Sequence, residues 1–179
     1  MACFWNSYGK VTKQSAIKHI KSLSELTPKP NIKSNLIVDI DKKVQNDILD
    51  LDTDDELAVR DLLLGILHRA VGELEISKRY LDECVEYRHK INDDTWAPAF
   101  AVYELALLQL NECDSKVKGV ENEDKIKQIW KSGLSNAEKL LDFAASGEFG
   151  STYDLEGRQM TRQLMLKDEI LTKKMKLNL

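Results

Sequence analysis

Apolar residues recur at steps of three and four along almost the whole chain, and no stretch alternates strictly between apolar and polar residues. Steps of three and four are typical of amphipathic helices, whereas strict alternation is typical of half-buried strands. Such stripes occupy residues 12–26, 39–50, 74–89 and 122–146. The segment 56–71 is apolar nearly all round, so a helix there must be packed on several sides. The sequence therefore predicts an all-α fold.

Capping and breaking residues predict where several helices begin and end. Thr53 and Glu56 form the Thr-x-x-Glu pattern of a capping box, which starts the helix that Gly72 then breaks. The body of the next predicted helix, residues 100–110, is again largely apolar. Residues 111–121 are polar and contain a glycine, so we expect a loop there.

The pattern divides the chain into three parts. We expect a truncated first helix hairpin at 1–26, and a linker with a short helix and an acidic stretch at 27–55. Residues 56–179 are then helical repeats, ended by a capping helix at 152–174. Because the first hairpin is short, the chain is expected to be a fragment that begins in mid-repeat.

Charge and composition argue against several classes of protein. The 179 residues include 26 Lys and Arg against 30 Asp and Glu, without a dense basic cluster, which does not favour nucleic-acid binding. The longest apolar run, 62–67, is far shorter than the ~20 residues of a membrane-spanning helix. Three distant cysteines do not form a disulfide framework. These features predict a cytoplasmic protein and allow a nuclear share.

Catalytic and metal-binding motifs are absent from the sequence. His19, His68 and His89 do not have the spacing of zinc ligands to one another or to a cysteine. His68 lies in an apolar pattern and is predicted to be a core imidazole. The sequence has no nucleotide-binding or nucleophile motif. We therefore expect a protein that is not an enzyme and needs no metal or cofactor.

A 34-residue frame that starts at Ala58 aligns this chain with tetratricopeptide repeats. In such repeats, small residues on both helices of a hairpin let the two helices touch closely. The frame places Gly65 and Ser77 at these two positions. A second, degenerate copy follows it. The residues expected to pack the repeats are Gly65, Gly72, Ser77, Leu81, Cys84, Leu105, Ala106 and Ala137.

Two stretches make the resemblance more specific. They are Leu64-Gly65-Ile66-Leu67-His68-Arg69 and the segment 96–106, in which a proline and an aromatic residue precede Tyr-Glu-Leu-Ala. These two sequence stretches resemble the fungal inclusion body clearance proteins and related animal tetratricopeptide-repeat proteins. It corresponds to the carboxyl-terminal part of those longer proteins. The resemblance implies an α-α superhelix of helix hairpins, and a role in clearing protein inclusion bodies together with lipid-droplet proteins.

In the repeats that this chain resembles, one helix face lines a concave groove. Such a groove either is filled by the chain itself or docks a protein partner. The alternative function is a carrier of a sterol-like or acyl ligand in an apolar cavity between helices. The residues expected to form the groove are Val59, Leu62, Ile66, Arg69, Phe100, Tyr103 and Leu107.

A basic cluster ends the last predicted helix, at Lys173, Lys174 and Lys176. Cations near a helix carboxyl terminus complement the helix dipole, and this is the interpretation we favour. Weak peripheral contact with an anionic membrane is the alternative.

Overall fold

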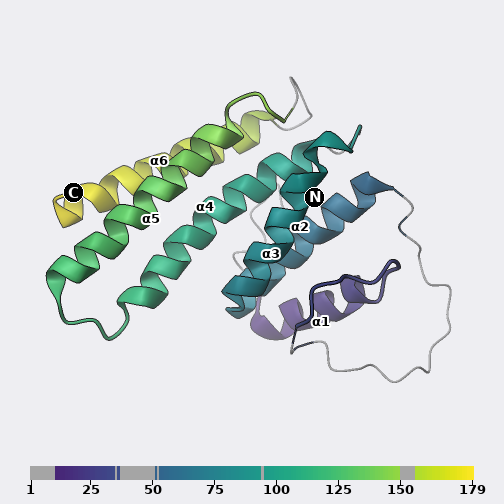
Figure 1. The fold of residues 1–179 in the computed structure, drawn as a ribbon, viewed down its shortest axis with the longest axis horizontal. Helices are drawn as coiled ribbons and strands as arrows, with labels where there is room; N and C mark the ends of the chain where they lie inside the picture. The colour runs from purple at the N-terminus through teal and green to yellow at the C-terminus, as the bar shows by residue number, and fades with distance from the viewer. Residues whose placement is uncertain (1–10, 35, 37–50, 52, 94, 150–155) are drawn as a thin grey trace. The chain divides into compact units, whose positions relative to one another are not determined.

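The structure is a computed structural model, and it describes residues 11–34, 36, 51, 53–93, 95–149 and 156–179. These residues form helices and their connections and contain no strand, so the prediction of an all-α fold is confirmed (Figure 1). The stack of tetratricopeptide hairpins stays a prediction. The elements are α1 (Lys13–Ser24), α2 (Asp54–Val71), α3 (Leu74–Glu86), a 3-10 turn η3 (Tyr87–His89), α4 (Trp96–Val117), α5 (Glu123–Ala144) and α6 (Glu156–Leu177).

The chain divides into two compact units, one that ends at Pro98 and one that begins at Ala99. The predicted boundaries at residues 26 and 55 stay a prediction. The helix expected at 39–50 and the residues 1–10 of the expected first hairpin lie outside the described residues.

In the first unit, α2 and α3 form an antiparallel hairpin. The predicted capping box is confirmed, because the Thr53 side chain accepts from the Glu56 backbone N–H and Glu56 accepts from the Thr53 backbone N–H. Gly72 ends α2 with φ +92°, a conformation that glycine adopts without strain. The capping box at its start and Gly72 at its end thus fix the length of α2, and the turn at Gly72 lets α3 return along it.

The core of the first unit joins α1 to this hairpin. Its members come from α1, from the connection after α1, and from α2 and α3. The Tyr80 hydroxyl reaches that connection and donates to the backbone carbonyl of Ile32 at 3.1 Å. The buried residues of this core are Ala16, Ile20, Ile32, Leu64, Leu67 and Tyr80.

The predicted loop at 111–121 is wrong, because α4 continues to Val117. Two features hold the extra turns in helical form. Glu112 and Lys116 form an ion pair of 2.9 Å between positions i and i+4, which supports a helix. Cys113 is buried and Val117 packs against the core of the second unit. The turn itself is short, and Asn122 caps the next helix by accepting from the Lys125 backbone N–H at 2.9 Å.

In the second unit, α5 and α6 run antiparallel beside each other (Figure 1). Ion pairs of 2.7 Å between Lys167 and Asp142 and of 2.6 Å between Lys174 and Glu138 join them. The Lys173 ammonium lies 3.9 Å from the centre of the Trp130 ring. The buried core of this unit is Ala106, Cys113, Trp130, Leu134, Ala137, Leu141, Leu166 and Ile170.

Candidate functional site

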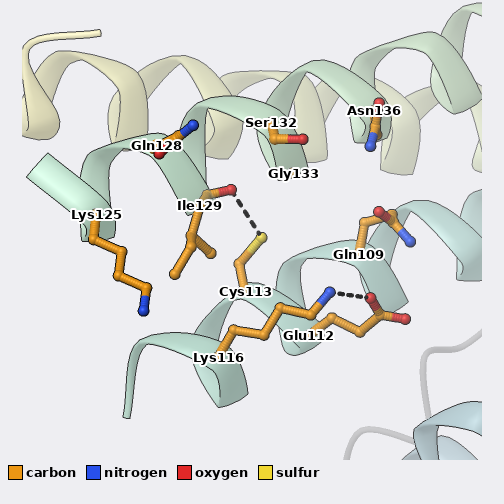
Figure 2. A pocket seen from close by; sticks show the side chains of 10 residues that line it. All are labelled: Gln109, Glu112, Cys113, Lys116, Lys125, Gln128, Ile129, Ser132, Gly133 and Asn136. Carbon is orange, nitrogen blue, oxygen red and sulfur yellow. Dashed lines mark hydrogen bonds and ion pairs between the residues drawn. The ribbon is translucent and has the colours of Figure 1, made fainter. Parts of the chain in front are cut away.

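A cleft of about 340 Å³ lies between α4 and α5, entirely within the second unit (Figure 2). Seven of the ten residues that line it carry a polar or charged side chain, although most of the surface exposed in the cleft belongs to apolar atoms. The residues from α4 are Gln109, Glu112, Cys113 and Lys116, and those from α5 are Lys125, Gln128, Ile129, Ser132, Gly133 and Asn136.

The floor of the cleft is a close contact between the two helices. A Cβ atom built on Gly133 would lie 2.0 Å from the Cys113 sulfur, so only glycine fits there without a shift. The Cys113 thiol is buried and donates to the backbone carbonyl of Ile129 at 3.7 Å. Because burial raises the pKa of this thiol, Cys113 stays protonated at neutral pH and is a poor nucleophile.

One wall of the cleft is a row of exposed side chains on α5. Gln128, Ser132 and Asn136 succeed one another at four-residue steps, which puts them on one face of the helix at a pitch of ~6 Å. Gln109 lies opposite them on α4 (Figure 2). The walls therefore offer amide and hydroxyl groups, which both donate and accept hydrogen bonds.

The charged residues of the cleft gather at one end. Lys116 and Glu112 form their ion pair there, and Lys125 projects toward the same end from α5 (Figure 2). Within the described residues, no group of three or more His, Cys, Asp or Glu side chains is arranged to hold a metal ion. The lining of the cleft contains no histidine that could serve Cys113 as a base.

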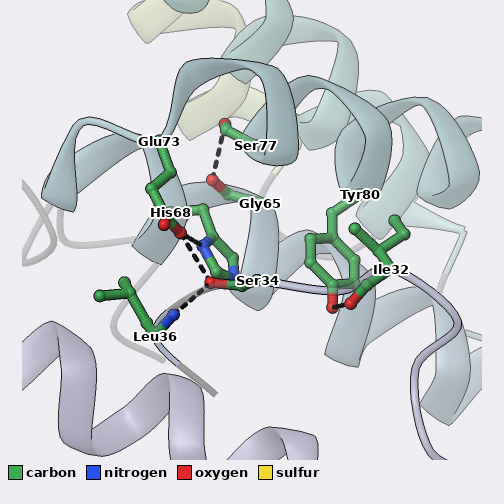
Figure 3. A network of polar contacts seen from close by, with 8 residues as sticks. All are labelled: Ile32, Ser34, Leu36, Gly65, His68, Glu73, Ser77 and Tyr80. Carbon is green, nitrogen blue, oxygen red and sulfur yellow. Dashed lines mark hydrogen bonds and ion pairs between the residues drawn. The ribbon is translucent and has the colours of Figure 1, made fainter. Parts of the chain in front are cut away.

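A second polar cluster surrounds His68 in the first unit (Figure 3). His68 is fully buried, its Nδ1 lies 2.7 Å from a carboxylate oxygen of Glu73, and its ring stacks on Tyr80 with centroids 5.3 Å apart. The Ser34 hydroxyl donates to the same Glu73 oxygen at 2.9 Å and accepts from the Leu36 N–H at 3.0 Å. These contacts bind the segment after α1 to the α2/α3 hairpin, so they are structural.

Burial is the largest influence on the His68 imidazole, and it lowers the pKa of that group. The hydrogen bond and charge of Glu73 act in the opposite direction but are smaller. His68 is therefore neutral at pH 7. Its burial confirms the prediction of a core imidazole, although its Nε2 has no hydrogen-bond partner among the described residues.

A buried ion pair lies on α2, between Arg60 and Asp61, with 3.0 Å between Arg60 Nε and Asp61 Oδ1. Arg60 also donates to the backbone carbonyl of Pro28. Burial raises the pKa of Asp61 to about 6, although the positive charge of Arg60 lowers it. Sequence analysis missed this pair, because two charged neighbours on a helix ordinarily lie in solvent.

The residues predicted to line a partner groove fall in both units. Leu62, Ile66 and Phe100 are almost fully buried, so a partner would not meet their side chains in this structure. The groove itself stays a prediction. Its other members, Val59, Arg69, Tyr103 and Leu107, are half-buried.

The residues predicted to pack the repeats lie in the interior, except for the turn residue Gly72. Gly65 and Ser77 meet where α2 crosses α3, and Ala106 and Ala137 both belong to the core of the second unit. The other three, Leu81, Cys84 and Leu105, are buried.

Sequence analysis also missed the α4/α5 cleft. Gly133 is its one visible signal, because a glycine inside a helical pattern often marks a close approach of another element. The wall residues gave no signal, since single Gln, Ser and Asn residues on a polar helix face are typical of solvent-exposed surface.

The chain matches no protein-family model, no curated protein and no solved structure. Among the described residues, none of the helices is long and apolar enough to span a membrane.

Proposed function

We propose that this protein is a non-catalytic helical scaffold that holds an extended segment of a protein partner in the α4/α5 cleft. The observation that carries the proposal is the row of Gln128, Ser132 and Asn136 along the cleft.

The spacing of this row suits an extended peptide. Residues four apart on a helix are ~6 Å apart along its axis. In an extended chain, residues two apart are ~6.6 Å apart. Three successive wall residues can therefore meet every second residue of one bound segment.

The chemistry of the row suits the same ligand. A side-chain amide carries both a donor and an acceptor, so Gln128 and Asn136 can pair with the N–H and the C=O of a peptide backbone. Gln109 offers the same groups from α4. Lys125 adds a positive charge at one end, which favours a segment with an acidic residue there.

The alternative of a carrier for an apolar ligand is less well supported. Pockets for apolar ligands are lined mainly by hydrophobic and aromatic side chains. In the α4/α5 cleft, Ile129 is the single aliphatic side chain of the lining. The polar side chains of the cleft thus suit a ligand that forms hydrogen bonds, and its apolar surface suits the side chains of the same bound segment.

The resemblance to the inclusion body clearance family supports a finer proposal. The partners are then lipid-droplet proteins, the process is the clearance of protein inclusions, and the helix hairpins continue as a tetratricopeptide superhelix. The expected site of action is the cytoplasm, with a nuclear share allowed.

The test is a selection of random peptides displayed on phage, with the purified chain as bait. The affinity of the selected peptides is then measured for the wild type and for a double variant, Gln128→Ala with Ser132→Ala. Removal of the Gln128 and Ser132 side chains should weaken peptide binding by about tenfold or more, because contacts at the centre of an interface carry most of its binding energy.

The matched control is Lys131→Ala with Ser135→Ala, two substitutions on α5 that lie outside the cleft lining. It should leave the affinity unchanged. Equal weakening by both double variants, or no effect of either, would contradict the proposal.

A further inference from the structure

Helix α6 carries two apolar stripes. The first includes Leu166 and Ile170, which are buried in the core of the second unit. The second consists of Met160, Leu164, Leu171 and Met175, whose side chains are between 54% and 63% exposed. We call these four residues the outer stripe.

The outer stripe is straight enough to act as one surface. At ~100° per residue, its four members fall within ~60° around the helix and extend over ~22 Å. A surface helix of a globular protein needs a single apolar stripe to pack on its core. Four large apolar side chains in a second stripe therefore mark a surface that another molecule covers.

We propose that the outer stripe binds the outer stripe of a second copy of this chain, with the two α6 helices parallel. Two-fold symmetry makes such an interface self-complementary, since any contact from one residue to a second residue of the partner is made twice, once in each direction. Leucine and methionine suit the pairing, because both are flexible and apolar.

The charges beside the stripe favour a second copy as the occupant and set its direction. Lys167 and Asp168 lie at the midpoint of the stripe, and the helical angle puts them on opposite edges of it, ~50° to each side. In a parallel pair, Lys167 of each copy faces Asp168 of the other, so two ion pairs form. In an antiparallel pair, lysine faces lysine and aspartate faces aspartate, which is repulsive.

The Lys167 side chain is available for this contact. Its ammonium lies 2.7 Å from Asp142 of the same chain, and 41% of the side chain is exposed. The ammonium has three donors, so it can contact a second carboxylate while the bond to Asp142 persists.

Sedimentation velocity on the full chain, over a series of concentrations, tests the association. The wild type should convert from monomer to dimer as its concentration rises. Leu164→Glu should abolish the dimer, and Asp168→Lys should weaken it by about tenfold or more. Glu169→Lys makes the same charge change on the other side of α6 and should have no effect. Unchanged thermal melting of each variant shows that the fold is intact, since all of these side chains are exposed.

Two further measurements test the direction of the pair. A charge-swapped variant, Lys167→Asp with Asp168→Lys, should pair with itself but not with the wild type, because lysine then faces lysine in the mixed parallel pair; in an antiparallel arrangement the mixed pair would be the favoured one. Spin labels at Lys176, on a Cys3→Ser background, have no axial offset in a parallel dimer, whereas an antiparallel dimer adds an axial separation of ~25 Å to the distance across the pair.

Three results would overturn the proposal. The chain could remain monomeric at every concentration, or the two labels could lie at the antiparallel distance. The third is a chain that stays monomeric but floats with phosphatidylserine vesicles, with flotation lost in Leu164→Glu; the occupant would then be a membrane.

Discussion

The hydroxyl of Ser77 donates a hydrogen bond to the backbone carbonyl of Gly65, with 2.8 Å between the two oxygens. This bond joins α3 to the middle of α2 at a point where Gly65 has no side chain to keep the helices apart. A Cβ atom on Gly65 would lie 2.6 Å from the side chain of Leu81 and 3.3 Å from the Ser77 carbonyl oxygen. The close approach therefore depends on glycine.

Gly65→Ala is expected to destabilise the protein. Overpacking against Leu81 costs about 1–3 kcal/mol, whereas the better helix propensity of alanine returns up to about 1 kcal/mol. The net effect is a lower free energy of unfolding, which chemical denaturation measures. Gly157→Ala is the control, because nothing lies within 4 Å of a Cβ there and the exposed helix should gain stability. An equal gain at both glycines would contradict the packing of α2 on α3.

Gly133→Ala is expected to destabilise the second unit through its contact with the Cys113 sulfur. Cys113→Ala removes that sulfur, so the double variant should be more stable than the sum of the two single effects predicts. Neighbouring residues of this kind couple by about 0.5–3 kcal/mol. Thermal or chemical unfolding of the four proteins gives the coupling, and strictly additive effects would show that the two residues are not in contact.

Much of the first unit could be predicted from local sequence. Thr53 and Glu56 have the spacing of a capping box, and Gly72 interrupts an apolar run where α2 ends. Gly65 and Ser77 have the spacing of small residues that meet in a helix hairpin. Each of these signals concerns a backbone requirement that few residue types can meet, so the sequence alone reveals it.

The end of α4 and the cleft could not be predicted in this way. The polar composition after Leu110 favoured a loop, but tertiary contacts of Cys113 and Val117 keep the segment helical. The cleft depends on how closely α5 approaches α4 at Gly133, which is a property of two helices together. The residue pattern along one helix does not reveal how closely a second helix approaches it.

His68 is expected to make the stability of the protein decrease in mild acid. Its pKa is lowered in the folded state, so the unfolded state binds a proton more readily. Stability therefore rises with pH in this window, and the contribution is complete above the ordinary pKa of 6.5 and lost as the pH falls below it. The free energy of unfolding of the wild type, minus that of His68→Gln, should decrease from pH 7 to pH 5. A constant difference would mean that folding does not shift the pKa of His68, and an increase toward pH 5 would mean that the folded protein holds His68 charged.

Asp61 should give the opposite slope. Its pKa is raised from 3.8 to about 6 in the folded protein, so here the folded state binds the proton more readily. The contribution is present below pH 3.8 and is lost as the pH rises through 6. The free energy of unfolding of the wild type, minus that of Asp61→Asn, should therefore decrease from pH 4 to pH 6 and then stay level. An increase over the same range would show that the charge of Arg60 outweighs burial.

The most direct test of the proposed scaffold function is nuclear magnetic resonance of the side-chain amides during titration with a selected peptide. Gln109, Gln128 and Asn136 line the α4/α5 cleft, and their NH₂ groups report any ligand that forms hydrogen bonds there. We predict that these three amides shift together and saturate at one dissociation constant, while the amide of Gln14 on α1 stays unchanged. Shifts confined to residues outside the cleft, with the three amides unmoved, would contradict the account.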